Sequence, residues 1–240
     1  MNKVNDIYTN NNVNLKMDDN IAIMTISNGK QNKLIDPEFL PLEDLKKWLK
    51  NNNPVGLIIC GNGRNFSSGA DVEEISRLKN RPEILKDHIK KGKKILDYIE
   101  KLPYITVAAI SGMCCGGGLE VALSCQFRIA THTSVFSFPE AKLGLLPGLG
   151  GTVRLQNLVG RSKSIRMIIT GEVYLAEEAL QMGLVDKLVE KGESLDEAKK
   201  LILSICNGKM NKIINTINHK SYDYETDMFV QCVQQCEFHY

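Results

Sequence analysis

The stretch AAISGMCCGGGLEVALSCQ, residues 108–126, decides the fold because it joins an apolar run to a helical pattern through three consecutive glycines. The glycines allow close backbone approach, and EVALSC after them has a helical pattern. A helix that begins near the glycines directs free N–H groups and the positive end of its dipole toward a developing anion. Because a single glycine-rich segment more often forms a tight turn, the interpretation depends on the neighbouring segments.

Two further glycine-containing segments flank this stretch. GNGRNFSSGAD (61–71) follows an apolar run upstream, and FSFPEAKLGLLPGLGGTVRL (136–155) lies downstream. The commoner glycine motifs do not fit, since Gly61-Asn-Gly63 lacks the third glycine of a dinucleotide fingerprint and Gly116–Gly118 lack the lysine and hydroxyl of a phosphate loop. A GxSxG nucleophile elbow is also missing from the sequence.

Taken together, the three segments resemble the motifs of the crotonase (enoyl-CoA hydratase/isomerase) superfamily. Those motifs look like G-x-x-F-x-x-G-A-D, A-x-x-G-x-x-x-G-G-G-x-E and F-x-x-P-E-x-x-L-G-x-x-P-x-x-G-G, in the order found here. ITGEVYLAEEALQMGLVDKLV (169–189) also resembles a family stretch, so the resemblance covers about residues 20–190. The family's usual aspartate after the GGGxE helix is replaced by Gln126, which we expect to alter packing and not chemistry.

The resemblance implies an α/β fold with a crotonase-like ββα-spiral core over residues 1–190. Residues 191–240 are expected to form a helical C-terminal region, shortened relative to the family, that packs with the core. The alternation of short β-rich runs with helical patterns independently favours α/β layering. Strands are predicted at 21–27, 55–61, 105–110, 127–138 and, more weakly, 184–189. Helices are predicted over 39–52, 82–101, 175–182, 195–206 and 227–236.

Water addition to a double bond conjugated with a thioester places negative charge on the carbonyl oxygen, which two preorganised N–H donors stabilise. The resemblance assigns this oxyanion hole to the backbone N–H groups of Ser67 and Gly117. It also matches Ser67, Ser68, Gly69 and Ala70, together with Gly117, to the segment that binds the thioester and coenzyme A in relatives.

The proton transfers need carboxylates, and Glu120 and Glu140 are the candidates. Each has a simpler interpretation as a residue at the start of a helix, where a glutamate complements the dipole or follows a proline. The resemblance places both on the two catalytic glutamates of the family's hydratases. Because the titrations of such a pair are coupled, the sequence does not say which carboxyl is the acid and which the base.

These residues predict a hydratase or dehydratase that acts on an acyl thioester carried by coenzyme A or an acyl carrier protein. Coenzyme A is then part of the substrate, and no further cofactor or metal is expected. An isomerase or decarboxylase of the same superfamily, in which one glutamate dominates, is the alternative, and a non-catalytic binding or scaffold protein is another. The resemblance also implies a homotrimer or hexamer. A predicted helix carries lysines that are available for coenzyme phosphates, although a solvated face is the simpler interpretation: Lys86, Lys90, Lys91, Lys93 and Lys94.

The composition fits an ordinary globular domain, with 43% hydrophobic and 24% charged residues among 240. With 30 Lys and Arg against 28 Asp and Glu, the charge balance does not indicate nucleic acid or an anionic membrane as partner. No signal-peptide or membrane-spanning pattern is present, so a cytoplasmic protein is expected. The seven cysteines favour buried, reduced thiols over disulfides. Cys232, Cys236 and His239 form only a weak metal-binding pattern.

Overall fold

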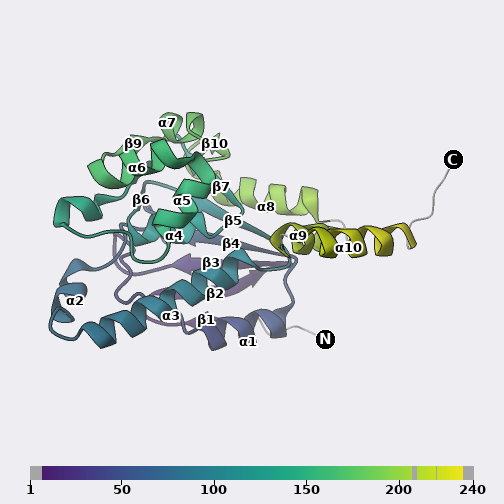
Figure 1. Cartoon of the computed structure of the whole chain (residues 1–240), viewed down its shortest axis with the longest axis horizontal. Helices are drawn as coiled ribbons and strands as arrows, with labels where there is room; N and C mark the ends of the chain where they lie inside the picture. Colours follow the sequence, from purple (N-terminus) through teal and green to yellow (C-terminus); the bar gives the residue numbers. More distant parts are fainter. Residues whose placement is uncertain (1–6, 207–209, 220, 235–240) are drawn as a thin grey trace.

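The computed structural model describes residues 7–206, 210–219 and 221–234, which form two β-sheets surrounded by helices (Figure 1). The main sheet contains β1 (Tyr8–Thr9), β2 (Val13–Asp18), β3 (Ile21–Ile26), β4 (Gly56–Gly61), β5 (Ile105–Ile110), β7 (Phe127–Thr131) and β10 (Lys187–Val189). The smaller sheet contains β6 (Met113–Cys115), β8 (Val135–Ser137) and β9 (Tyr174–Leu175).

The strands of the main sheet lie in the order β1-β2-β3-β4-β5-β7-β10. The pairs from β3 to β10 are parallel, with Ile21 opposite Gly56 and Gly56 opposite Ile105, whereas β1, β2 and β3 pair antiparallel. Parallel strands place their carboxyl ends at one edge of the sheet. The segments that follow β4, β5 and β7 therefore leave the sheet at the same edge.

Helices cover both faces of the main sheet and account for most of the remaining described chain. They are α1 (Leu42–Asn52), α2 (Val72–Arg77), α3 (Pro82–Glu100), α4 (Gly117–Leu123), the 3₁₀ helix η1 (Pro139–Leu143), α5 (Gly151–Val159), α6 (Arg161–Thr170), α7 (Ala176–Gln181), α8 (Ser194–Ile205), α9 (Met210–His219) and α10 (Tyr222–Gln234). Figure 1 shows α9 and α10 extending from the core at the end opposite α2. No helix in the described ranges is both long and apolar enough to cross a membrane.

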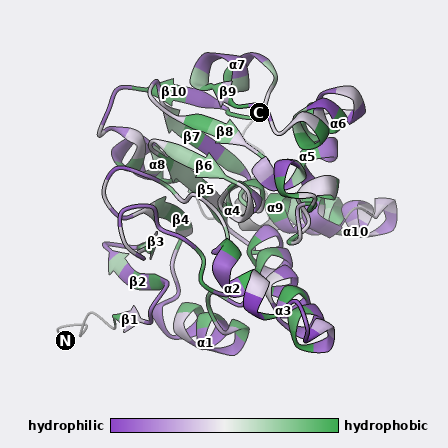
Figure 2. Ribbon diagram, turned by 90° about the vertical axis from the view of Figure 1, so that its left-hand side faces the viewer, coloured by the Kyte–Doolittle hydropathy of each residue, from purple (hydrophilic) through white to green (hydrophobic). Residues whose placement is uncertain are grey.

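The core has two parts because successive residues of a strand face opposite sides of the sheet. On β5, Ala108 and Ile110 belong to the larger cluster, whereas Val107 and Ala109 belong to the smaller one. The larger cluster takes in residues of α1, α3 and α4, and the smaller one packs against α8 through Ile202. Figure 2 shows the hydrophobic colour concentrated on the central strands, as expected for a parallel sheet covered on both faces.

The structure confirms the α/β class and most predicted elements, with three differences. The predicted strand 127–138 is two strands in different sheets, because the chain turns at Thr131–Ser134 before β8 joins β6. The last helix begins at Tyr222 and not at Asp227, and positions 235–236 of that prediction lie outside the described residues. The sequence did not predict β1, β2, β6, β9, α2, α5, α6 and α9 as separate elements.

Gln126 ties the end of α4 to β5. Its Oε1 accepts hydrogen bonds from the backbone N–H and the hydroxyl of Thr106, at 2.5 and 2.9 Å, while its Nε2 is buried with no partner in the described chain. Gln126 therefore contributes to the packing between the end of α4 and β5.

Six cysteines lie in the described residues and all are free thiols, as predicted. Cys232 is exposed, however, so the prediction of burial is wrong for that residue. No cluster of three potential metal ligands occurs among the described residues, and Cys236 and His239 lie outside them.

Candidate active site

A cleft of about 330 Å³ opens at the edge of the sheet where the segments after β4, β5 and β7 meet. Ala70 reaches it from the segment after β4, Gly117 and Glu120 from α4, and Glu140 from η1. Apolar side chains form most of the remaining wall: Leu34, Pro37, Ile75, Leu85, Ile89, Leu145, Leu146 and Leu149. The fold thus brings both predicted glutamates to one apolar cleft.

Gly116 is the N-cap of α4 and brings this helix up against η1. Its φ of +51° and ψ of −128° lie in a region that residues with a side chain avoid. A Cβ at this position would also lie 2.9 Å from Glu140 Oε1. The glycine run therefore lets the backbone turn into α4 and leaves space for the second carboxyl group.

Glu120 lies in the first turn of α4 and is only 2% exposed. Its Oε1 accepts hydrogen bonds from the backbone N–H groups of Leu149 and Gly151, each at 2.7 Å. Burial raises the pKa of this carboxyl to about 7, although the two N–H donors oppose the rise, and the nearby charge of Glu140 adds to it. Near neutral pH the group can therefore both accept and release a proton.

Glu140 is the second residue of η1 and follows Pro139. Burial raises the pKa of its carboxyl as well, and its Oε2 is buried without a hydrogen-bond partner in the described chain. An unpaired buried carboxyl oxygen is unfavourable unless it serves a ligand or a reaction. The cleft therefore contains two carboxyl groups that interact electrostatically and hold protons more tightly than solvated glutamates do.

The backbone N–H groups of Ala70 and Gly117, which both line the cleft, have no hydrogen-bond acceptor among the described residues. Gly117 begins α4, where the first N–H groups of a helix have no partner within the helix. The two amides are neighbours, because a Cβ on Gly117 would lie 3.6 Å from the nitrogen of Ala70. This pair is suited to bind one oxygen that carries negative charge.

The structure corrects the prediction that Ser67 is one of these donors. Its N–H donates to Met113 O at 3.0 Å in a bridge between Ser67 and Cys114, and the residue is fully buried. Its hydroxyl donates to Asn32 O at 2.7 Å and accepts from Gly69 N at 3.1 Å. Ser67 is therefore a structural residue of the loop, and the free donor is Ala70.

The other predicted substrate-binding residues are of two kinds, those that line the cleft and those that shape the loop behind it. Ala70 and Gly117 line the cleft, whereas Ser68 and Gly69 do not. The N–H of Ser68 donates to Gln31 O at 2.9 Å, and Gly69 packs so tightly that a Cβ would lie 2.7 Å from Cys115 O. Their contribution is to shape the loop that presents Ala70.

Sequence reasoning missed the role of Leu149 and Gly151, whose amides hold Glu120. The only signal for them was the glycine pair at 150–151 within the third motif. It also missed Leu34 and Pro37, which enter the cleft from the segment between β3 and α1. That segment has no periodic pattern that would have indicated its position.

Comparison with known proteins identifies the family of the chain. Residues 16–237 match the family model described as enoyl-CoA hydratase/isomerase. The chain therefore belongs to the enoyl-CoA hydratase/isomerase family, which is the crotonase superfamily indicated by the sequence motifs.

Individual relatives are similar over nearly the whole chain. A probable enoyl-CoA hydratase of Bacillus subtilis (strain 168) is 33% identical over an alignment of 223 residues that covers 90% of this chain and 85% of that protein. The crystal structure of an enoyl-CoA hydratase from Bacillus anthracis has a TM-score of 0.82 at 26% identity, covering 93% of this chain and 91% of that one. The structure of Pseudomonas aeruginosa DspI has a TM-score of 0.82 at 28% identity, covering 98% of this chain and 100% of that one.

Proposed function

We propose that this protein adds water to, or removes it from, the α,β double bond of an acyl thioester. The observation that carries the proposal is the meeting of two buried carboxyl groups, Glu120 and Glu140, with two unpartnered N–H groups in one apolar cleft. A hydratase needs both sets of groups. The probable hydratase function of the relative from Bacillus subtilis supports the same choice.

In the proposed reaction, the thioester carbonyl oxygen binds between the N–H groups of Ala70 and Gly117. One carboxylate takes a proton from water as the oxygen of that water bonds to the β-carbon. The electrons of the double bond move onto the thioester oxygen, where the two donors stabilise them. The other carboxyl then protonates the α-carbon, so the net change is the addition of one water molecule.

The coupled titration of Glu120 and Glu140 suits a reaction that runs in both directions, because either carboxyl group can hold the shared proton. We assign the pair to the chemistry and leave the roles of acid and base within the pair unassigned. The apolar wall formed by Ile75, Leu85 and Ile89 is suited to the acyl chain.

The test is ultraviolet absorbance of a crotonyl thioester, since hydration removes the conjugation of the double bond. We expect the absorbance to fall when the purified protein is added and the 3-hydroxyacyl product to appear. Constant absorbance with tight binding would instead indicate a non-catalytic binding protein. A product with a shifted double bond would indicate an isomerase. A decarboxylase is tested separately with an acyl thioester that carries a free carboxyl group, since the crotonyl group has none to lose.

The carrier of the acyl group is either coenzyme A or an acyl carrier protein. The lysines of α3 are all exposed, and they belong to the helix that contributes Leu85 and Ile89 to the cleft: Lys86, Lys90, Lys91, Lys93 and Lys94. Lys86 and Lys91 pair with neighbouring carboxylates. The charge of Lys90, Lys93 and Lys94 supports a phosphate-bearing carrier, which both alternatives provide. Comparing kcat/KM for the two forms of the same acyl group distinguishes them.

A further inference from the structure

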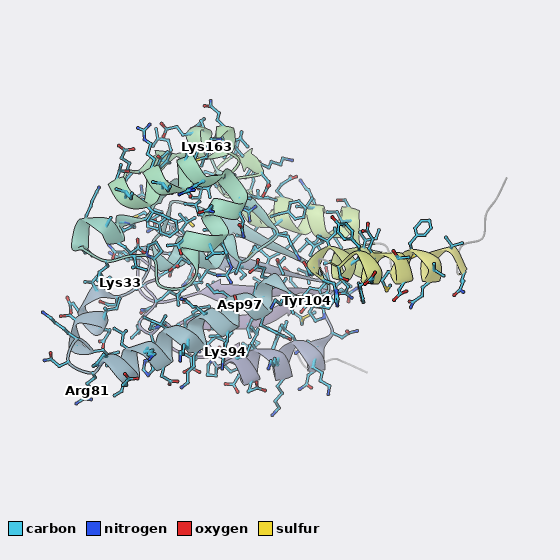
Figure 3. The ribbon with its side chains drawn as sticks, in the orientation of Figure 1. Lys33, Arg81, Lys94, Asp97, Tyr104 and Lys163 are labelled. Carbon is cyan, nitrogen blue, oxygen red and sulfur yellow. The ribbon has the colours of Figure 1, made fainter. Side chains whose placement is uncertain are left out.

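Arg154 is a buried arginine on α5, only 9% exposed, that connects three parts of the chain. Its Nη1 donates to Leu149 O at 2.8 Å. On α3, its Nε donates to Glu100 Oε2 at 2.9 Å and its Nη2 to Asp97 Oδ1 at 2.5 Å. Figure 3 labels Asp97 near the C-terminal end of α3. Burying a guanidinium is costly, and this arginine is compensated by hydrogen bonds along its whole fork.

The main-chain group that Arg154 binds belongs to the turn that holds Glu120. Leu149 uses its carbonyl oxygen to accept from Arg154 and its N–H to donate to Glu120 Oε1, so one residue joins the two side chains. Gly150 lies against the guanidinium, because a Cβ there would collide with Arg154 Nη1. Gly151 supplies the second N–H to the same carboxyl oxygen.

We propose that Arg154 is a positioning residue: by fixing the Leu149–Gly151 turn to α3, it holds the Glu120 carboxyl group in place for the reaction. Its consequence for catalysis rests on the proposed function, whereas the fixing of Glu120 does not. The positive charge of Arg154 also stabilises the ionised form of Glu120. It lowers the pKa of this carboxyl group against the larger effect of burial.

A purely structural role, tying α5 to α3, would lower stability without changing Glu120. A structural role and a positioning role are separated by following the Leu149 and Gly151 amides of the full-length protein by NMR as the pH is changed. Both amides donate to Glu120 Oε1, so their chemical shifts report the ionisation of this carboxyl. Glu120→Gln serves to assign the transition, because it removes the titrating group.

Arg128 offers a matched control. It is 3% exposed, and its fork donates to Leu184 O, Cys125 O and Asp186 Oδ2 at 2.7 to 3.1 Å. Arg128→Gln therefore removes a comparable buried cation beyond the C-terminal end of α4, away from the turn that holds Glu120. Arg154→Gln and Arg154→Lys are the test variants.

We expect Arg154→Gln to move the amide titration to higher pH and to lower kcat by about 10-fold or more, since small misplacements of catalytic groups are costly. Arg154→Lys keeps the positive charge, so the pH of its amide titration should lie closer to that of the wild type than to that of Arg154→Gln. If the titration and kcat of Arg154→Gln match those of Arg128→Gln, the proposal is overturned. A wild-type protein that hydrates no thioester would defeat the proposed function, yet the amide titration would still decide this inference.

A second variant addresses the case in which Arg154→Gln does not fold. Asp97 and Glu100 are about half exposed, so Asp97→Asn combined with Glu100→Gln should fold. Arg154 then loses its charged anchors on α3. We expect the Leu149 and Gly151 amides to exchange with solvent faster, and unchanged protection would contradict the inference.

Discussion

At the residue scale, Glu120 combines nearly complete burial with an ionisable carboxyl group and two main-chain donors. Because burial raises its pKa from 4.5 to about 7, the folded protein holds this proton at pH values where the unfolded chain has released it. The stability contributed by the protonated group is complete below about pH 4.5 and is lost as the pH rises through about 7. The loss is on the order of 3 kcal/mol.

Glu120→Gln should remove this pH dependence, because the amide oxygen can still accept from both N–H groups and carries no charge. We expect the free energy of unfolding of the variant, relative to that of the wild type, to be higher at pH 8 than at pH 5. Urea unfolding at the two pH values measures this difference. If the variant and the wild type differ in unfolding free energy by the same amount at pH 5 and pH 8, the raised pKa of Glu120 is contradicted.

The oxyanion hole gives a second prediction at this scale. Replacing Ala70 by lactic acid converts the Gly69–Ala70 amide to an ester. This deletes an N–H that has no partner in the described chain and weakens the Gly69 carbonyl, which accepts from Leu34 N, so folding should be kept with a small loss of stability. kcat/KM should fall by about 100-fold or more, as for the loss of a comparable donor. Ser67→Ala removes a buried hydroxyl that bonds to Asn32 O and Gly69 N, so it should lower stability. Its kcat should stay near the wild-type value, because Ser67 does not line the cleft. A fully active ester variant would remove Ala70 from the oxyanion hole.

The sequence predicted the glutamates and Gly117 at the cleft but assigned the wrong partner amide. Motif position indicates which loop approaches the substrate, whereas the availability of an N–H depends on long-range pairing. The pairing between Ser67 and Met113 joins residues 46 positions apart, and no local pattern in the chain indicates it. The same reason explains why the contacts of Leu149 and Gly151 with Glu120 were not predicted.

At the scale of elements, the position of α4 depends on contact between its first turn and the loop after β4. A Cβ on Gly118 would lie 2.6 Å from the Cβ of Ser67, closer than real structures allow. Gly118→Ala should therefore displace the start of α4, lower stability by about 1–3 kcal/mol and reduce kcat.

Gly148→Ala is the stability control for that prediction, because a Cβ there has no atom nearer than 4.0 Å. Gly148 lines the cleft, so only the stabilities of the two variants are compared, by thermal unfolding. Equal stability of the two variants would argue against the close packing of α4 on Ser67.

Elements with a one-sided apolar pattern were the ones that sequence could predict. α3 buries Ile95, Leu96 and Ile99 on one face, and its predicted bounds agree with the structure to within one residue. α5 and α6 were missed because apolar residues occur on both faces. In α5, Leu155 and Val159 are buried while Val153 is largely exposed.

At the scale of the whole molecule, many of the exposed apolar side chains lie in two regions. One comprises Val153 and Leu158 on α5, Ile165 and Ile169 on α6, and Val173 and Leu175 around β9. The other comprises Tyr222, Phe229, Val230 and Val233 on α10, which extends from the core (Figure 1). So much exposed apolar surface on a monomer is unusual, and it supports our proposal of a trimer or hexamer.

Light scattering at micromolar concentration tests this assembly. We expect a mass of three or six chains of 26.8 kDa each. Replacing Ile169 and Val173 by lysine should shift the population toward smaller species, because charge in a buried interface is costly. A wild-type protein that remains monomeric would contradict the proposal and leave the active-site assignment unchanged.

The most direct test of the central claim is the hydration rate of a cognate enoyl thioester by the wild type, Glu120→Gln and Glu140→Gln, each checked for folding. If both carboxyl groups act on one water molecule and one α-proton, each substitution lowers kcat by at least about 100-fold. Near wild-type hydration by folded Glu140→Gln would contradict the two-carboxylate account and favour a reaction that needs only one glutamate.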